Sequence, residues 1–165
     1  ATLLGTRSLS TRMSISAANF AMVYRLLLAD DDAAFREVVR EVCAPFFEIL
    51  EADTGDAALE IAVGEHPELA LCDFHMPGCS GLEALSALKT FDVRRPAILM
   101  TSDVSADLRE RVQLARIDSL LAKPFTRHQL LQTFANAIDT AYHDGGMTQR
   151  LRNVARNRVF GNDQH

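Results

Sequence analysis

Long hydrophobic runs are absent from this sequence of 165 residues, in which no eighteen apolar residues are consecutive. We therefore expect no membrane-spanning segment. Cysteine is scarce as well: Cys43, Cys72 and Cys79 are the three cysteines, and they contain no CxxC pair. An odd number of unpaired cysteines is typical of reduced, mostly buried thiols, so we expect a cytoplasmic protein.

Positive charge is also scarce in the body of the chain. Residues 26–143 carry ten basic and twenty acidic side chains, whereas residues 1–25 carry three arginines and no acid. Binding to a nucleic-acid backbone needs clustered Lys and Arg on one face. An acidic body with short basic ends argues against a nucleic-acid partner.

The first segment, residues 1–23, is rich in Ser, Thr, Ala and Arg and has no acidic residue. This composition superficially resembles an organelle transit peptide, but a secretory hydrophobic segment is missing. We interpret these residues as a leader or disordered arm, with a targeting peptide as the alternative.

The last segment, residues 144–165, reads as a basic C-terminal tail with four arginines and two aspartates. Met147, Leu151 and Val154 have helical spacing, enough for about one or two turns. The segment is too short for a helix-turn-helix or another effector domain. We expect a solvated tail, with a docking or dimerisation segment as the alternative.

Between these ends, short apolar runs alternate with helical patterns. Such runs are typical of parallel strands covered on both faces. The expected strands are residues 25–29, 47–52, 69–73, 97–102 and 119–123. In the first helical pattern, we expect the core-facing side chains to be Phe35, Val38, Val39, Val42 and Cys43. Five strands alternating with five helices predict an α/β fold with a doubly wound, five-stranded parallel sheet.

Reactive side chains stand where four of these strands end. They are Asp30, Asp31 and Asp32 after the first strand, Asp73 at the third, Thr101 at the fourth and Lys123 at the fifth. Open sheets of this kind bind ligands outside the carboxyl ends of their strands. We therefore expect these side chains to meet in one crevice.

Adjacent carboxylates repel one another, and a positive partner removes that repulsion. A solvent-accessible carboxylate cluster suits Mg²⁺, which takes one or two protein carboxylates, waters and a phosphate oxygen. Asp73 is then a candidate nucleophile that forms an aspartyl phosphate. Lys123 is suited to neutralise charge on the transferred phosphoryl group, and Thr101 to bond one of its oxygens.

Four motifs in this order resemble the receiver domain of bacterial two-component response regulators, the CheY-like family. The matching segments are LLLADDD, DFHMPGCSGLEAL, ILMTS and AKPF. The resemblance implies a flavodoxin-like (βα)5 fold with strand order 2-1-3-4-5, covering residues 24–143.

The same resemblance implies a role for each site residue. The implied metal ligands are Asp30, Asp31, Asp73 and the backbone carbonyl of His75. Asp73 matches the phosphoacceptor, Thr101 the switch hydroxyl, and Lys123 the lysine before a cis Pro124. Asp32 lies at a variable position, and we expect it to cap the following helix.

The resemblance implies a phosphorylation-dependent switch that needs Mg²⁺. A histidine kinase or phosphotransfer protein is the expected donor, the downstream target is unknown, and no enzyme activity is expected beyond self-phosphorylation and autodephosphorylation. Two alternatives stay open. One is a Mg²⁺-dependent haloacid-dehalogenase-type phosphatase, which also begins with a strand leading into a DxD pattern such as Asp30–Asp32. The other is a pseudo-receiver that binds partners without phosphorylation.

Three positions depart from the family pattern. Leu120 stands where the family has Tyr or Phe, so the signal cannot pass through an aromatic rotamer. We hypothesise that the loop after Thr101 or the fifth helix carries it, and a large effect of Leu120→Tyr on partner binding would contradict this. Arg116-Ile117 replaces Gly-Ala, which makes a positive φ less accessible. Ser102 replaces Ala or Gly, which is expected to alter water access to the phosphoaspartate.

Overall fold

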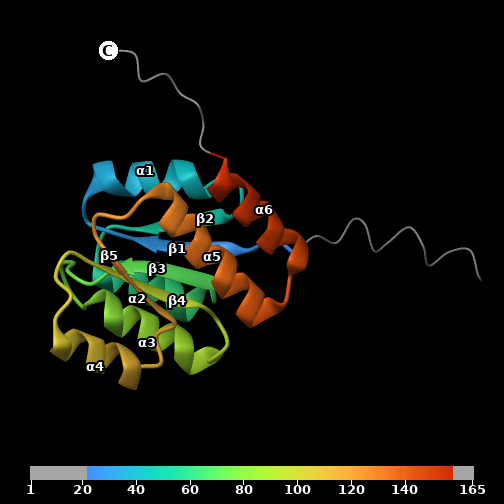
Figure 1. Ribbon diagram of the computed structural model, residues 1–165. Coiled ribbons are helices and arrows are strands. Elements are labelled where there is room, and N and C mark those ends of the chain that lie inside the picture. The colour runs from blue at the N-terminus through green and yellow to red at the C-terminus, as the bar shows by residue number, and fades with distance from the viewer. Residues whose placement is uncertain (1–21, 158–165) are drawn as a thin grey trace, which may run out of the picture.

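The computed structural model describes residues 22–157, and the expected leader, residues 1–23, lies almost wholly outside them. Five strands alternate with helices along this part of the chain, and a sixth helix follows (Figure 1). The elements are β1 Arg25–Ala29, α1 Ala33–Cys43, β2 Glu48–Ala52, α2 Gly55–Gly64, β3 Leu69–Asp73, α3 Gly81–Phe91, β4 Ala97–Thr101, α4 Ala106–Leu114, β5 Ser119–Ala122, α5 Arg127–Tyr142 and α6 Gly145–Arg156.

The strands form one parallel sheet in the order β2-β1-β3-β4-β5, which confirms the predicted doubly wound fold. Ala29 pairs with both Ala52 and Cys72, and Thr101 pairs with Ala122. The carboxyl ends of the strands therefore share one edge of the sheet. The inner strands β3 and β4 are wholly buried, whereas the edge strands β2 and β5 are partly exposed.

Helices cover both faces of the sheet (Figure 1). Because side chains alternate along a strand, Leu26 and Leu28 face α1, α5 and α6, whereas Leu27 and Ala29 face α2, α3 and α4. Each face thus has its own apolar core.

The first helix differs from its prediction at one position. Phe35, Val39, Val42 and Cys43 face the core as expected, but Val38 is 60% exposed. Around the helix axis, the buried face of α1 is centred between the directions of Phe35 and Val39. Val38 lies at the edge of this face, on the solvent side.

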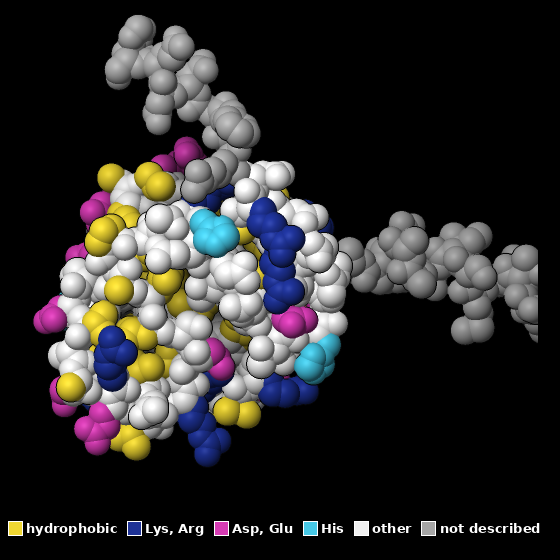
Figure 2. All heavy atoms as spheres, in the orientation of Figure 1, with side chains coloured by type: hydrophobic (Ala, Val, Ile, Leu, Met, Phe, Trp, Pro, Cys, Tyr) yellow, Lys and Arg dark blue, Asp and Glu magenta, His cyan; other side chains and the backbone are white. Residues whose placement is uncertain are grey.

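The expectation of a solvated tail is wrong for Gly145–Arg156, which forms α6. Met147, Leu151 and Ala155 are buried in the core that α5 and α1 also line. Asp144 caps the helix by accepting the Met147 N–H at 2.9 Å, and it also accepts the Tyr24 hydroxyl at 2.9 Å. Burial, together with this bond to Asp144, raises the pKa of Tyr24. Figure 2 shows a stripe of basic side chains over α6, on its solvent side.

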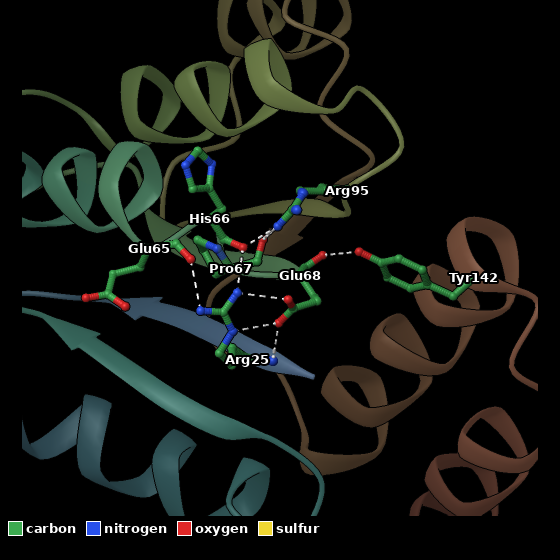
Figure 3. Close-up of polar contacts among 7 residues, drawn as sticks. All are labelled: Arg25, Glu65, His66, Pro67, Glu68, Arg95 and Tyr142. Carbon is green, nitrogen blue, oxygen red and sulfur yellow. Dashed lines mark hydrogen bonds and ion pairs between the residues drawn. The ribbon is translucent and has the colours of Figure 1, made fainter. Parts of the chain in front are cut away.

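The amino ends of the strands are joined by a polar network around Arg25 (Figure 3). The Arg25 guanidinium donates to the Glu68 carboxylate at 2.9 and 3.1 Å and to the carbonyls of Glu65 and His66. Burial opposes ionisation of Glu68, yet these bonds hold its carboxyl pKa below the usual value. The Tyr142 hydroxyl donates to the Glu68 carbonyl at 2.6 Å. The network therefore fixes β1, the start of β3 and α5 to one another.

Two of the positions that depart from the pattern of the receiver family can be located in the structure. Arg116 adopts φ 57° in the turn between α4 and β5, a conformation that favours glycine. Leu120 packs from β5 on the α2–α4 side of the sheet and is partly buried. Within residues 22–157, no helix has the length and apolar character needed to cross a membrane.

Because Leu151 is fully buried at the contact of α6 with the core, we expect Leu151→Ala to lower the free energy of unfolding by about 2–4 kcal/mol. Gln149 is exposed on the same helix, so Gln149→Ala is a matched control with an effect of less than about 0.5 kcal/mol. Urea unfolding followed by circular dichroism measures both. Equal effects of the two substitutions would show that α6 does not pack in solution.

Candidate functional site

Three carboxylates meet where β1 and β3 end. One carboxylate oxygen of each of Asp30, Asp31 and Asp73 lies within 4.8 Å of the other two. Asp30 is completely buried and Asp73 nearly so, whereas Asp31 is exposed. The predicted convergence of these side chains is therefore observed, with Asp31 on the solvent side.

Lys123 comes to this cluster from the end of β5. Its Nζ donates to Asp30 Oδ2 at 2.6 Å and lies 3.4 Å from Asp73 Oδ1. The Lys123 backbone N–H donates to the Thr101 carbonyl at 2.8 Å, and the Lys123–Pro124 peptide is cis, as expected. The ammonium thus joins the ends of β1, β3 and β5.

Local hydrogen bonds shape the turn between β1 and α1. Asp30 Oδ1 accepts the Asp32 N–H at 2.9 Å, so both of its carboxylate oxygens have a partner. Asp32 accepts the Phe35 N–H at 3.1 Å and caps α1, as predicted. Arg36 donates to the Asp30 carbonyl at 2.6 Å, a role that the sequence does not reveal because nothing distinguishes this arginine from Arg40 on the same helix.

Burial is the main reason why the pKa of Asp73 is raised, and the charges of Asp30 and Asp31 add to the effect. Lys123 acts in the opposite direction but does not cancel it. Three carboxylates face one ammonium, so the cluster has an excess of negative charge. Oxygen donors with excess negative charge and an exposed member fit a hard cation such as Mg²⁺.

The loop after β3 is supported by α2 and α3. A Cβ at position 81 would lie 2.0 Å from the Asp73 carbonyl oxygen, so only glycine lets α3 begin there. Asp56 accepts the Cys79 N–H at 3.2 Å, and the Gly55 N–H donates to the Pro77 carbonyl at 2.9 Å. The sequence alone does not mark Gly81 as a site residue, because the need for glycine there comes from a tertiary contact.

His75 lies in the same loop with an exposed side chain, and its ring contacts Phe74. The role of its backbone carbonyl as a metal ligand stays a prediction.

Thr101 is completely buried at the end of β4. Its hydroxyl accepts the Asp103 N–H at 3.1 Å and lies 3.2 Å from the Asp103 carbonyl oxygen. The hydroxyl is therefore engaged within its own loop, and its bond to a phosphoryl oxygen stays a prediction. The neighbouring Ser102 is exposed.

A cavity of about 440 Å³ lies away from this cluster, near the amino ends of β4 and β5 and the last turns of α5. Its polar lining includes Arg94, Asp118, Asn136 and Thr140. Asp118 is already bonded to the Ala97 N–H and to Lys89. The chemistry of the acidic cluster does not involve this cavity.

The doubly wound sheet and the acidic cluster with its lysine define a class of α/β domains with an acidic pocket at the carboxyl ends of the strands. Residues 26–135 match the family of the response regulator receiver domain, so the chain belongs to that family.

Individual relatives agree with this assignment. The chain is 30% identical over 118 residues to the chemotaxis protein CheY of Halobacterium salinarum, covering 71% of this chain and 98% of that protein. It is 30% identical over 102 residues to sporulation initiation phosphotransferase F of Bacillus subtilis, covering 61% and 82%. The crystal structure of a CheY-like receiver domain protein from Methanospirillum hungatei JF-1 has the same fold, with a TM-score of 0.70, 24% identity, and coverage of 75% and 100%. Several other relatives are longer, and the chain spans 16% to 60% of their length.

The raised pKa of Asp73 predicts a pH-dependent stability in the absence of divalent cations. The unfolded carboxyl ionises near pH ~3.9, and the folded one ionises at a higher pH. The contribution of Asp73 to stability is therefore lost as the pH rises through its folded pKa. We expect Asp73→Asn to be more stable than the wild type at pH 7 in EDTA, and this advantage to disappear below the unfolded pKa.

Chemical unfolding across this pH range measures the difference. Asp92→Asn is the matched control: hydrogen bonds from Arg94 lower the pKa of Asp92, so this substitution should destabilise at pH 7. A loss of stability in Asp73→Asn at neutral pH would contradict the burial argument.

Proposed function

We propose that the protein is a phosphorylation-dependent signalling switch that accepts a phosphoryl group on Asp73 with Mg²⁺. The observation that carries this proposal is the convergence of Asp30, Asp31, Asp73 and Lys123 at one edge of the sheet. Membership of the receiver family supports it. The geometry favours Asp73 as the acceptor, and the family assignment supports the receiver function.

In the transfer, an oxygen of Asp73 attacks phosphorus while the bond from phosphorus to the donor breaks, and the donor leaves with that electron pair. Mg²⁺, when bound, neutralises charge on the phosphoryl oxygens. Asp30, Asp31 and Asp73 would hold it, with the His75 carbonyl as a further ligand. Lys123 supplies a second positive charge, since its Nζ already lies 3.4 Å from Asp73.

A transferred phosphoryl group changes the charge beside the loop after β4. Thr101 can then exchange its bonds with Asp103 for one to a phosphoryl oxygen, which moves that loop. Leu120 lies on β5, next to the strand that ends in Thr101, and it replaces the aromatic residue of the family. Because the signal cannot pass through an aromatic rotamer, the loop after Thr101 or α5 carries it.

The donor we propose is a histidine kinase or phosphotransfer protein. The relative named sporulation initiation phosphotransferase F supports a phosphotransfer partner. We propose no activity beyond self-phosphorylation and autodephosphorylation.

The phosphatase alternative needs both Asp30 and Asp32 as reactive carboxylates. Asp32 instead caps α1 by accepting the Phe35 N–H. This contact favours the receiver function, as does the position of Asp73. The intact acidic cluster likewise favours it over a binding module independent of phosphorylation.

Incubation with acetyl phosphate and Mg²⁺ should add one phosphoryl group, detected by intact mass. The added mass should be lost in Asp73→Asn and in EDTA, and retained in the control Asp107→Asn, an exposed position in α4. An unmodified wild type would refute the proposed function. Turnover of a phosphate ester that survives Asp73→Asn but not Asp30→Asn would favour the phosphatase.

Metal binding should also stabilise the fold. At a Mg²⁺ concentration of about ten times Kd, we expect the free energy of unfolding to rise by about 1.4 kcal/mol. Asp31→Asn should reduce this gain because it removes the exposed carboxylate, whereas Asp92→Asn should keep it. Thermal unfolding with and without Mg²⁺ checks the prediction, and a gain that is equal in all three proteins would place the cation elsewhere.

A further inference from the structure

The ammonium of Lys123 has a third neighbour besides the two carboxylates. Its Nζ lies 4.2 Å from the centroid of the Phe35 ring, over the face of the ring. The same nitrogen is 2.6 Å from Asp30 Oδ2 and 3.4 Å from Asp73 Oδ1. An ammonium has three N–H groups, so two acidic partners and one aromatic face surround it.

Phe35 is itself held in place from two sides. It is the third residue of α1, and its N–H donates to the Asp32 cap at 3.1 Å. Its ring packs edge-on against Phe125, with centroids 5.7 Å apart and an interplanar angle of 79°. Phe125 follows Lys123 by two residues, so the aromatic pair links the start of α1 to the segment that carries the lysine.

We infer that Phe35 is a positioning residue for Lys123, an inference that rests on the proposed function. The lysine stem is flexible, and its ammonium needs to face Asp73 when phosphorus approaches. The ring face attracts the Lys123 ammonium, and it adds no negative charge to a cluster that already has an excess of negative charge. A carboxylate at the position of the Phe35 ring would compete with Asp30 and Asp73 for the ammonium. It would also increase the repulsion among the carboxylates.

The test compares Phe35→Leu, which removes the aromatic face, with Phe35→Tyr, which keeps it. With saturating Mg²⁺ and acetyl phosphate, the initial phosphorylation rate should fall about fivefold in Phe35→Leu and stay within about twofold in Phe35→Tyr. The affinity for Mg²⁺, measured by calorimetry, should be unchanged in both, because Phe35 acts on the lysine and not on the acidic ligands. A loss of Mg²⁺ affinity parallel to the loss of rate would overturn the inference.

Two further measurements separate positioning from packing. Trifluorinated phenylalanine at position 35 keeps the shape of the ring but weakens its negative face, so the rate should again fall. In a Lys123→Met background, Phe35→Leu should add no further loss. An unchanged rate in the fluorinated protein, or an equal loss in both backgrounds, would refute the positioning role.

The outcomes for the two proposals are distinct. If the wild type takes no phosphoryl group, or if Asp73→Asn takes one, the proposed function fails. If the wild type is phosphorylated at Asp73 and Phe35→Leu matches its rate, only the role of Phe35 fails.

Discussion

The ion pair of Lys123 with Asp30 and Asp73 is the constraint on which the site depends. Asp30 is fully buried, and its carboxylate would be left uncompensated without the ammonium, at a cost of about 3–5 kcal/mol for a pair of this kind. The same contact brings the ends of β1, β3 and β5 to one point. The edge of the sheet is therefore held together by the same charged groups to which we assign the proposed chemistry.

This pairing is incomplete, and the remaining negative charge suits the function that we propose. One ammonium faces three carboxylates, and the pKa of Asp73 is raised by burial and by its acidic neighbours. Repulsion among the carboxylates lowers the stability of the metal-free fold. A bound cation would relieve this repulsion. The aromatic face of Phe35 helps because it holds the ammonium without changing this charge balance.

Much of the fold follows from the sequence because its signals are local. Apolar runs of about five residues predicted every strand to within about one residue, and Asp32 stands where helix caps do. What the sequence did not predict are contacts between segments that are distant along the chain. The apolar positions of α6 were visible at Met147 and Leu151, but their partner surface on α1 and α5 exists only in the folded chain. The contacts of Phe35 and Gly81 with the site depend on tertiary packing in the same way.

The two ends of the sheet differ in a way that bears on how the proposed switch would work. At the amino ends, the Arg25 network satisfies its charges and ties β1, β3 and α5 together. At the carboxyl ends, the carboxylates keep an unbalanced charge beside short loops. A phosphoryl group on Asp73 would change the charge at the second end alone, while the first end holds the strands fixed. The movement then falls to the loop of Thr101 and to the segment around Lys123, whose side chains can exchange partners without breaking the core.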